Sequence, residues 1–126
     1  MIRYEPDEGL RQRLLGIARG LGMGHIDPRR LLCVRSLGSR STRILARCHG
    51  LPRVIQVALE RPPVYVIEVV SEQFEKLSPP EQTKVLIHEL MHIPEGFGGG
   101  FRSHRPYVTR RKVEALYRKL AAQEAA

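Results

Sequence analysis

The sequence predicts an α+β fold, in which a small twisted sheet of three or four strands packs on a helix, with further helices at both ends of the chain. Three observations lead to this prediction. Residues 64–70 are almost all apolar and mostly β-branched, which is typical of a buried strand. Residues 6–20 and 109–123 repeat their apolar side chains at helical spacing. Residues 78–93 carry a helix-start signal followed by a broad apolar arc.

The N-terminal half of the chain combines one helix with candidate strands. In residues 6–20 the apolar side chains recur among arginine and glutamine at helical spacing. Residues 30–37 are predicted to form a strand, whereas residues 41–48 fit either a strand or a short helix. Residues 53–59 alternate polar and apolar side chains and are predicted to form a half-buried strand. The apolar positions of the first helix are Leu10, Leu14, Leu15, Ile17 and Ala18.

The C-terminal half is predicted to be mainly helical after the strand at residues 64–70. A short helix is expected at residues 71–77. Ser78-Pro79-Pro80-Glu81 then places Ser at the N-cap, Pro at N1 and Glu at N3 of the next helix. That helix ends before Pro94, because a residue that precedes proline avoids the helical region. The last helix has one apolar stripe, formed by Val113, Leu116, Tyr117 and Leu120.

Length and composition favour a single globular domain over residues 1–126. A chain of this length can bury one modest core without disulfides. No apolar run reaches the roughly 18 residues of a membrane span, and the first residues lack the apolar core of a signal peptide. We therefore expect a cytoplasmic protein that does not contact membranes.

The formal net charge is +8, and 17 of the 21 basic residues are arginine. Asparagine is absent, and a shortage of thermolabile amides combined with many charges is typical of thermophile proteins. The positive excess fits a nucleic-acid partner, but it also fits arginines paired with the 13 acidic residues. The sequence contains no nucleic-acid-binding motif, and seven aromatic residues without tryptophan offer little surface for base stacking.

Cys33 and Cys48 are the two cysteines of the chain. In the cytosol of a mesophile they would be reduced, buried thiols, whereas in a hyperthermophile they could form a disulfide. Their separation in the sequence is compatible with both states.

The run His88-Glu89-Leu90-Met91-His92 is the main functional signal. On a helix, residues four apart lie on one face, so both imidazoles can point at one cation. Glu89 lies about 100° around the helix from His88, where its carboxylate can reach a water at the metal without becoming a ligand. This is the arrangement that a zinc hydrolase needs. The rest of the helix surface is broadly apolar, which predicts burial between layers.

Catalytic zinc usually takes three protein ligands, and two residues compete for the third position. His104 lies 12 residues after His92, beyond a segment with four glycines in five positions that lets the chain fold back. Glu114 lies 22 residues after His92 on the predicted last helix, and some zinc peptidases take a glutamate ligand from such a helix. His104 is the favoured candidate, because Glu114 also fits a solvated residue that pairs with a neighbouring arginine.

Several segments together resemble the putative phage metallopeptidase domain, a family that also occurs in archaea. The resemblance covers roughly residues 30–108 and implies a compact zincin with a His-Glu-x-x-His-Ile-Pro helix and a later histidine. It implies His88, His92 and His104 as metal ligands, Glu89 as catalytic acid/base and Zn2+ as cofactor. A more distant similarity to SprT-like zincins, some of which act near DNA, is consistent with this. The segments that carry the resemblance are residues 65–70, 74–78, 85–94, 97 and 100–104.

These observations predict a zinc-dependent metallopeptidase that acts on a peptide or protein substrate. Glu89 would take a proton from the attacking water and deliver one to the leaving amine. Tyr107, Arg102 and Arg105 are candidate donors to the oxyanion. Glu68 interrupts an apolar strand and is a candidate for holding a ligand imidazole, although a glutamate there more often faces solvent or pairs with an arginine. The alternative function is a basic, nucleic-acid-associated zinc-binding module with little or no catalytic activity.

Overall fold

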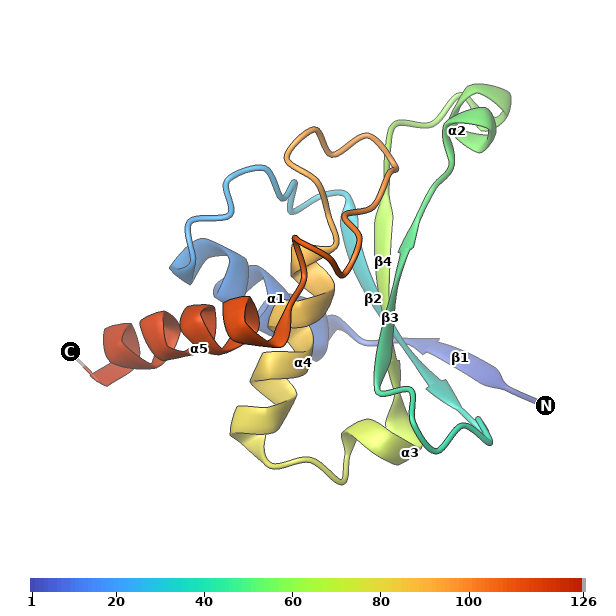
Figure 1. The fold of residues 1–126 in the computed structure, drawn as a ribbon. Helices are drawn as coiled ribbons and strands as arrows, with labels where there is room; N and C mark the ends of the chain where they lie inside the picture. Colours follow the sequence, from blue (N-terminus) through green and yellow to red (C-terminus); the bar gives the residue numbers. More distant parts are fainter. Residues whose placement is uncertain (126) are drawn as a thin grey trace.

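Four strands form one open mixed sheet in the computed structural model, which describes residues 1–125 (Figure 1). The strand order is β1-β2-β4-β3, with β2 and β4 parallel and each outer strand antiparallel to its neighbour. The predicted α+β class, with its small sheet and its N- and C-terminal helices, is confirmed. The strands are β1 (Arg3–Pro6), β2 (Leu31–Leu37), β3 (Ala46–Gly50) and β4 (Tyr65–Val70), and the helices are α1 (Glu8–Gly20), α2 (Arg53–Leu59), α3 (Ser71–Phe74), α4 (Pro79–Met91) and α5 (Arg110–Ala125).

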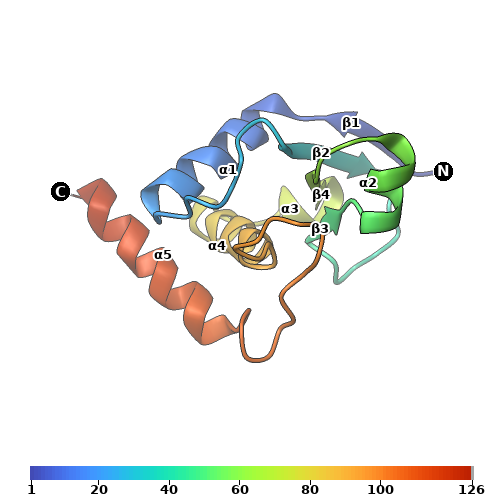
Figure 2. The same cartoon turned by 90° about the horizontal axis from the view of Figure 1, so that it is seen from above.

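Helices α1, α4 and α5 lie on one side of the sheet (Figures 1 and 2). Helices α1 and α4 contact strands, whereas α5 lies farther out and packs on α4 and α1. Helix α4 contacts α1, α5 and the outer strand β3. Helix α2 projects beyond the end of the sheet, in the connection between β3 and β4 (Figure 1). The helix that carries the histidine motif is therefore packed next to a free strand edge.

The core fills the space between the sheet and the helix layer. Alternate residues of a strand face the same side, and Tyr65, Ile67 and Val69 of β4 are fully buried on the helix side. Burying a large apolar side chain stabilises the fold by about 1.5–3 kcal/mol relative to leaving it exposed, so these contacts fix α4 against the sheet. The helix layer contributes, among others, Leu14, Leu86, Ile87 and Leu90, each with no exposed surface.

Helix α1 begins at Glu8 because Asp7 caps it, its carboxylate accepting a hydrogen bond from the Leu10 amide at 2.9 Å. The residues before it form the short edge strand β1, which no pattern in the sequence predicted. Arg35 of β2 donates to Asp7 at 2.7 Å and to Glu75, just beyond α3, at 2.6 Å. This arginine ties the start of α1 to the sheet and to the segment before α4.

The prediction of a strand over residues 53–59 is wrong, because these residues form helix α2. Gly50 and Tyr65 are the last pair of the β3–β4 ladder, so the chain between them lies beyond the end of the sheet, where it has no strand to pair with. In this position the backbone satisfies its hydrogen bonds internally, as a helix. Gln56 is the buried residue of α2, and its side-chain amide donates to two backbone carbonyls.

The other element boundaries differ little from the predictions. Residues 41–48, which fitted either a strand or a helix, contain irregular chain followed by β3 from Ala46. The short helix expected at residues 71–77 ends at Phe74. Within residues 1–125, none of the helices has both the length and the apolar character needed to cross a membrane.

Cys33 and Cys48 are free thiols. Both stand opposite Ile67, Cys33 from β2 and Cys48 from β3, on opposite sides of β4. Their backbones are two strand spacings apart, about 9–10 Å, which exceeds the Cα separation of about 4.4–6.8 Å that a disulfide requires. The register of the sheet therefore excludes a disulfide between them.

Candidate metal centre

The last turn and a half of α4 carries the two histidines of the motif. The helix starts as predicted, with Ser78 at the N-cap accepting a hydrogen bond from the Glu81 amide at 3.4 Å. It remains regular as far as Met91, and His92 is its C-cap. One turn separates His88 from His92, and their Nε2 atoms are 3.3 Å apart.

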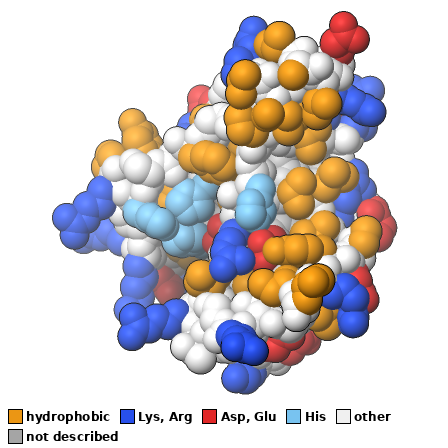
Figure 3. Space-filling model, turned by 90° about the vertical axis from the view of Figure 1, so that its right-hand side faces the viewer, with side chains coloured by type: hydrophobic (Ala, Val, Ile, Leu, Met, Phe, Trp, Pro, Cys, Tyr) orange, Lys and Arg blue, Asp and Glu red, His pale blue; other side chains and the backbone are white. Residues whose placement is uncertain are grey.

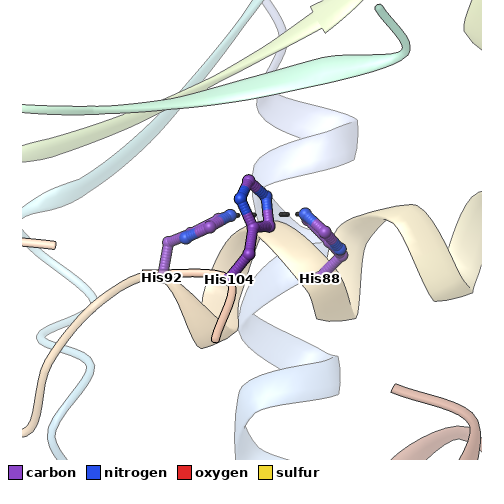
Figure 4. Close-up of side chains that lie close together, drawn as sticks. All are labelled: His88, His92 and His104. Carbon is purple, nitrogen blue, oxygen red and sulfur yellow. Dashed lines mark hydrogen bonds between the residues drawn. The ribbon is translucent and has the colours of Figure 1, made fainter. Parts of the chain in front are cut away.

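The loop after α4 brings His104 back to these two side chains (Figure 4). One ligand atom from each of His88, His92 and His104 lies within 4.8 Å of the other two. Two nitrogen ligands at about 2.0–2.1 Å from a tetrahedral zinc ion are about 3.3 Å apart. The separation of the first two nitrogens thus fits one small cation, and the donor set is the imidazole set that zinc accepts.

Two hydrogen bonds with the backbone of Arg102 fix the orientation of His92. The His92 carbonyl accepts a hydrogen bond from the Arg102 amide at 2.8 Å. The His92 Nδ1 atom is 2.7 Å from the Arg102 carbonyl. Because a carbonyl only accepts, Nδ1 carries the proton and Nε2 keeps its lone pair facing the other two histidines.

Tyr65 anchors the glycine-rich loop that leads to His104. Its hydroxyl donates to the Gly100 carbonyl at 2.7 Å and accepts from the Gly99 amide at 2.9 Å. Phe97 and Phe101 pack edge-on against its ring, with centroids 4.8 and 6.2 Å away. Sequence reasoning did not identify this role, because the first residue of an apolar strand carries no signal that its hydroxyl reaches a loop 34 residues away.

Gly99 is required by the close packing of the same loop. It has a φ of +106°, and a side chain there would lie 2.5 Å from the Leu51 carbonyl oxygen and 2.6 Å from the Gln56 amide. Gln56 in turn donates to the Gly98 carbonyl at 2.9 Å. The loop is therefore held between the end of the sheet and α2.

Burial shifts the pKa values of His88 and Glu89 in opposite directions. It lowers the pKa of His88 to about 4, with smaller contributions from His92 and His104. It raises the pKa of Glu89 to about 7. The Glu89 carboxylate lies 3.9 Å from His88 Nε2, and its side chain is 9% exposed. His88 is thus neutral, the form in which an imidazole can bind a metal, and Glu89 is beside the cluster without being part of it.

The comparison with family models gives a match to the putative phage metallopeptidase family over residues 2–119. The chain belongs to this family. The match extends beyond residues 30–108, on which the resemblance rested, and it includes β1 and most of α5. Neither the comparison with curated proteins nor the comparison with solved structures found a match. Membership of this family indicates a metallopeptidase-type protein and implies a metal ion, which the three histidines are placed to hold.

Glu114 does not lie with the histidine cluster. Its carboxylate pairs with Lys84 of α4 at 3.2 Å, and Lys84 also lies over the Tyr117 ring. The pairing with an arginine that the sequence suggested is thus replaced by pairing with a lysine on a neighbouring helix. Glu114 serves to join α5 to α4.

Glu68 also lies away from the cluster, on the face of the sheet opposite α4. Its carboxylate is 2.9 Å from His49 Nε2 and 3.1 Å from Arg47. The imidazole that it holds is therefore His49 of β3 and none of the three clustered histidines. The arginine pairing that the sequence offered as the simpler explanation is present.

The candidate oxyanion donors lie on or just after the His104 loop. Arg102 lies over the Tyr107 ring, 5.8 Å from its centroid, and 3.8 Å from the Glu95 carboxylate. Arg105 and Tyr107 are exposed. Arg102 contacts His92 through its backbone, but within residues 1–125 none of the three side chains forms a hydrogen bond or an ion pair with His88, His92 or His104.

A cleft of about 560 Å³ opens beside the centre, within the size range of small-ligand sites. Its walls come from residues 43–46, which lead into β3, from the outer side of α4 and from the start of α5. His88 and Glu89 line it. In the space-filling view, histidine side chains reach the surface on this face of the molecule, among hydrophobic and charged side chains (Figure 3). The candidate metal centre is therefore accessible from solvent through a cleft along a strand edge.

Proposed function

We propose that this chain is a zinc-dependent peptidase in which His88, His92 and His104 hold the metal and Glu89 is the general base. The observation that carries the proposal is that one ligand atom from each of three imidazoles lies within 4.8 Å of the other two. The buried Glu89 carboxylate lies beside them, 3.9 Å from His88 Nε2. Family membership supports the metallopeptidase class. The described residues supply three ligands, which leaves one position of a tetrahedral metal for a reactant.

Glu89 is placed to move protons at the reacting centre. When bound, a zinc ion acts as a Lewis acid that activates water and polarises the scissile carbonyl. The Glu89 carboxylate accepts the proton of the attacking water and delivers a proton to the leaving amine. Its position in the cleft wall, beside His88, serves both transfers.

The outer edge of β3 supports binding of the substrate in an extended form. This strand pairs with β4 on one side only, and it borders α4. An extended peptide can add to such an edge through backbone hydrogen bonds, with its side chains entering neighbouring pockets. If it runs antiparallel to β3, its C-terminal part enters the cleft, because the cleft begins where β3 starts.

The test of the proposal is the metal content of the purified protein, measured by mass spectrometry on wild type, His104→Ala and Glu114→Ala. We expect one zinc ion per chain in wild type and in Glu114→Ala, and little or none in His104→Ala. Glu114→Ala is the matched control, since it removes the rival ligand and only breaks the Lys84 pair. Zinc retained in His104→Ala but lost in Glu114→Ala would overturn the ligand assignment, and wild type that takes up no zinc would overturn the function.

A further inference from the structure

A large share of the formal net charge of the chain lies in residues 105–119, which lead into α5 and form its first part. Residues 105–119 contain six cationic side chains and one carboxylate, which leaves +5 of the formal net charge of +8. The cations are Arg105, Arg110, Arg111, Lys112, Arg118 and Lys119, which together are called the α5 cationic surface below. All six residues are exposed.

The α5 cationic surface has no acidic partner within the part of the chain that the structure describes. None of its six residues takes part in an ion pair there. The one carboxylate of the segment, Glu114, is engaged by Lys84. Arginines elsewhere, such as Arg35 and Arg47, do pair with acids. Internal ion pairs therefore do not account for the positive charge of the α5 cationic surface.

Helix geometry gathers four of these cations on one side of α5. Arg111 and Arg118 are seven residues apart, as are Lys112 and Lys119, so each pair lies on one line, about 10.5 Å apart along the axis. The buried residues Val113 and Leu120 lie on the opposite side. Figure 2 shows α5 at the periphery of the molecule, beyond α1 and α4 as seen from the sheet. The cations thus point away from the body of the protein.

We propose that the α5 cationic surface binds the phosphate backbone of double-stranded DNA. Two rows of cations along an exposed helix can neutralise several phosphates at once, and arginine binds phosphate oxygens with two parallel hydrogen bonds. The contact needs no base-reading side chain, so binding is independent of sequence. The surface adjoins His104, and DNA bound there would lie beside the metal centre.

The composition of α5 argues against a membrane as the occupant. A helix that lies on a membrane needs large apolar side chains on its outward face to enter the lipid. The large apolar residues of α5 are buried or half-buried against the protein, and none is among the exposed ones. The outer face of α5 presents cationic side chains, which attract the negatively charged phosphate backbone of DNA.

The experiment measures binding of a fluorescein-labelled 20-base-pair DNA duplex by anisotropy, over a series of salt concentrations. The test variant replaces Arg111, Lys112, Arg118 and Lys119 by glutamine. The control variant replaces Arg19, Arg40, Arg53 and Arg61 by glutamine, which removes the same charge from exposed positions on other elements. Wild type is expected to bind, with log K falling linearly against log salt, and the test variant is expected to lose at least about 100-fold in affinity at low salt and to reduce that slope by about 3. The control is expected to stay within a few-fold of wild type.

Equal losses in the two variants would show that only net charge matters and would overturn the proposal. Absence of wild-type binding at low salt would do the same, as would displacement of the DNA by phosphatidylglycerol vesicles at matched phosphate concentration. A variant with lysine at Arg111 and Arg118 keeps the charge and is expected to keep the salt slope, and a slope reduced as in the test variant would contradict a role for charge at these positions. The test variant is expected to keep the metal content of wild type, which would show that the substitutions leave the fold and the histidine cluster intact.

Discussion

Single residues around the centre differ in how far their surroundings change their chemistry. Burial keeps His88 uncharged and brings the pKa of Glu89 to about 7, so that this carboxyl group can exchange protons near neutral pH. His92 is oriented by a backbone carbonyl, and His104 by a loop that Tyr65 holds. The candidate ligands are thus positioned by neighbours outside the histidine cluster.

Replacing Glu89 by glutamine is expected to abolish hydrolysis and to leave metal binding intact. The amide keeps the size of the side chain but cannot accept the proton of the water, which costs at least about 100-fold in rate. Release of fluorescent peptides from labelled casein, together with metal content, measures both effects. Hydrolysis within tenfold of wild type would remove Glu89 from the mechanism.

Replacing Tyr65 by phenylalanine is expected to loosen the loop that carries His104. The Gly99 amide and the Gly100 carbonyl lose their partner, which is expected to cost about 1–3 kcal/mol of stability and to weaken metal binding by about 10-fold or more. Urea unfolding and zinc titration check the two effects. Tyr4→Phe is the matched control, because Tyr4 is 57% exposed, and a similar loss in both variants would contradict the anchoring role.

Among the elements, those with a strong local signal were predicted and those defined by long-range contacts were not. The cap of α4 at Ser78 and the apolar run of β4 are local features, and both elements were found where expected. Residues 53–59 were predicted to be a strand, but they lie beyond the last pair of the β3–β4 ladder, where no strand can pair with them, and they form α2. Strand β1 exists because β2 offers it an edge, which four residues cannot reveal by themselves.

The junction between α1 and the sheet is expected to weaken at acid pH. Burial raises the pKa of Asp7, but the Leu10 amide and the Arg35 guanidinium outweigh it and hold the pKa below its ordinary value. A lowered pKa means that Asp7 stabilises the fold fully above its unfolded pKa, about 3.9, and that this stability is lost as the pH falls through the lower folded pKa.

Asp7→Asn tests this dependence, because asparagine keeps the cap and loses the ion pair. We expect the variant to be about 1–2 kcal/mol less stable than wild type at pH 6, and the difference to narrow below about pH 4. Urea unfolding at pH 6 and pH 3 measures it. A difference that stays constant or widens at pH 3 would show that the charge of Asp7 is not responsible.

For the whole molecule, zinc binding is expected to raise thermal stability, because the ligands come together in the folded chain alone. Free zinc at 100 times its dissociation constant adds about 2.7 kcal/mol, which corresponds to roughly 10 °C in Tm for a chain of this size. Calorimetry with zinc and with chelator checks it. His104→Ala is expected to lose the zinc-dependent rise in Tm. His25→Ala is the control and is expected to keep it, since His25 contacts the Ile93 carbonyl outside the cluster. Equal rises in Tm in wild type and both variants would contradict the three-histidine centre.

The two thiols are expected to stay unreactive while the molecule is folded. Burial raises the pKa of Cys33 and of Cys48 to about 12, so alkylation by iodoacetamide should be at least about 100-fold slower than for free cysteine. Mass spectrometry of native and urea-unfolded protein measures the rates. A disulfide-linked chain, or a Tm that changes with reductant, would contradict the register that separates the two strands.

The sequence alone determined the helix of the candidate metal centre and the two histidines that this helix contributes, because capping and the four-residue spacing act within one helix. It also narrowed the third ligand to His104 or Glu114 and favoured the first. Only the tertiary structure placed His104 in the cluster and Glu114 against Lys84, since each outcome depends on contacts between distant segments: Tyr65 with the glycine loop, and α5 with α4. The strand order places β3 at the edge of the sheet and keeps the two cysteines apart as free thiols, and this order depends on how the whole sheet assembles.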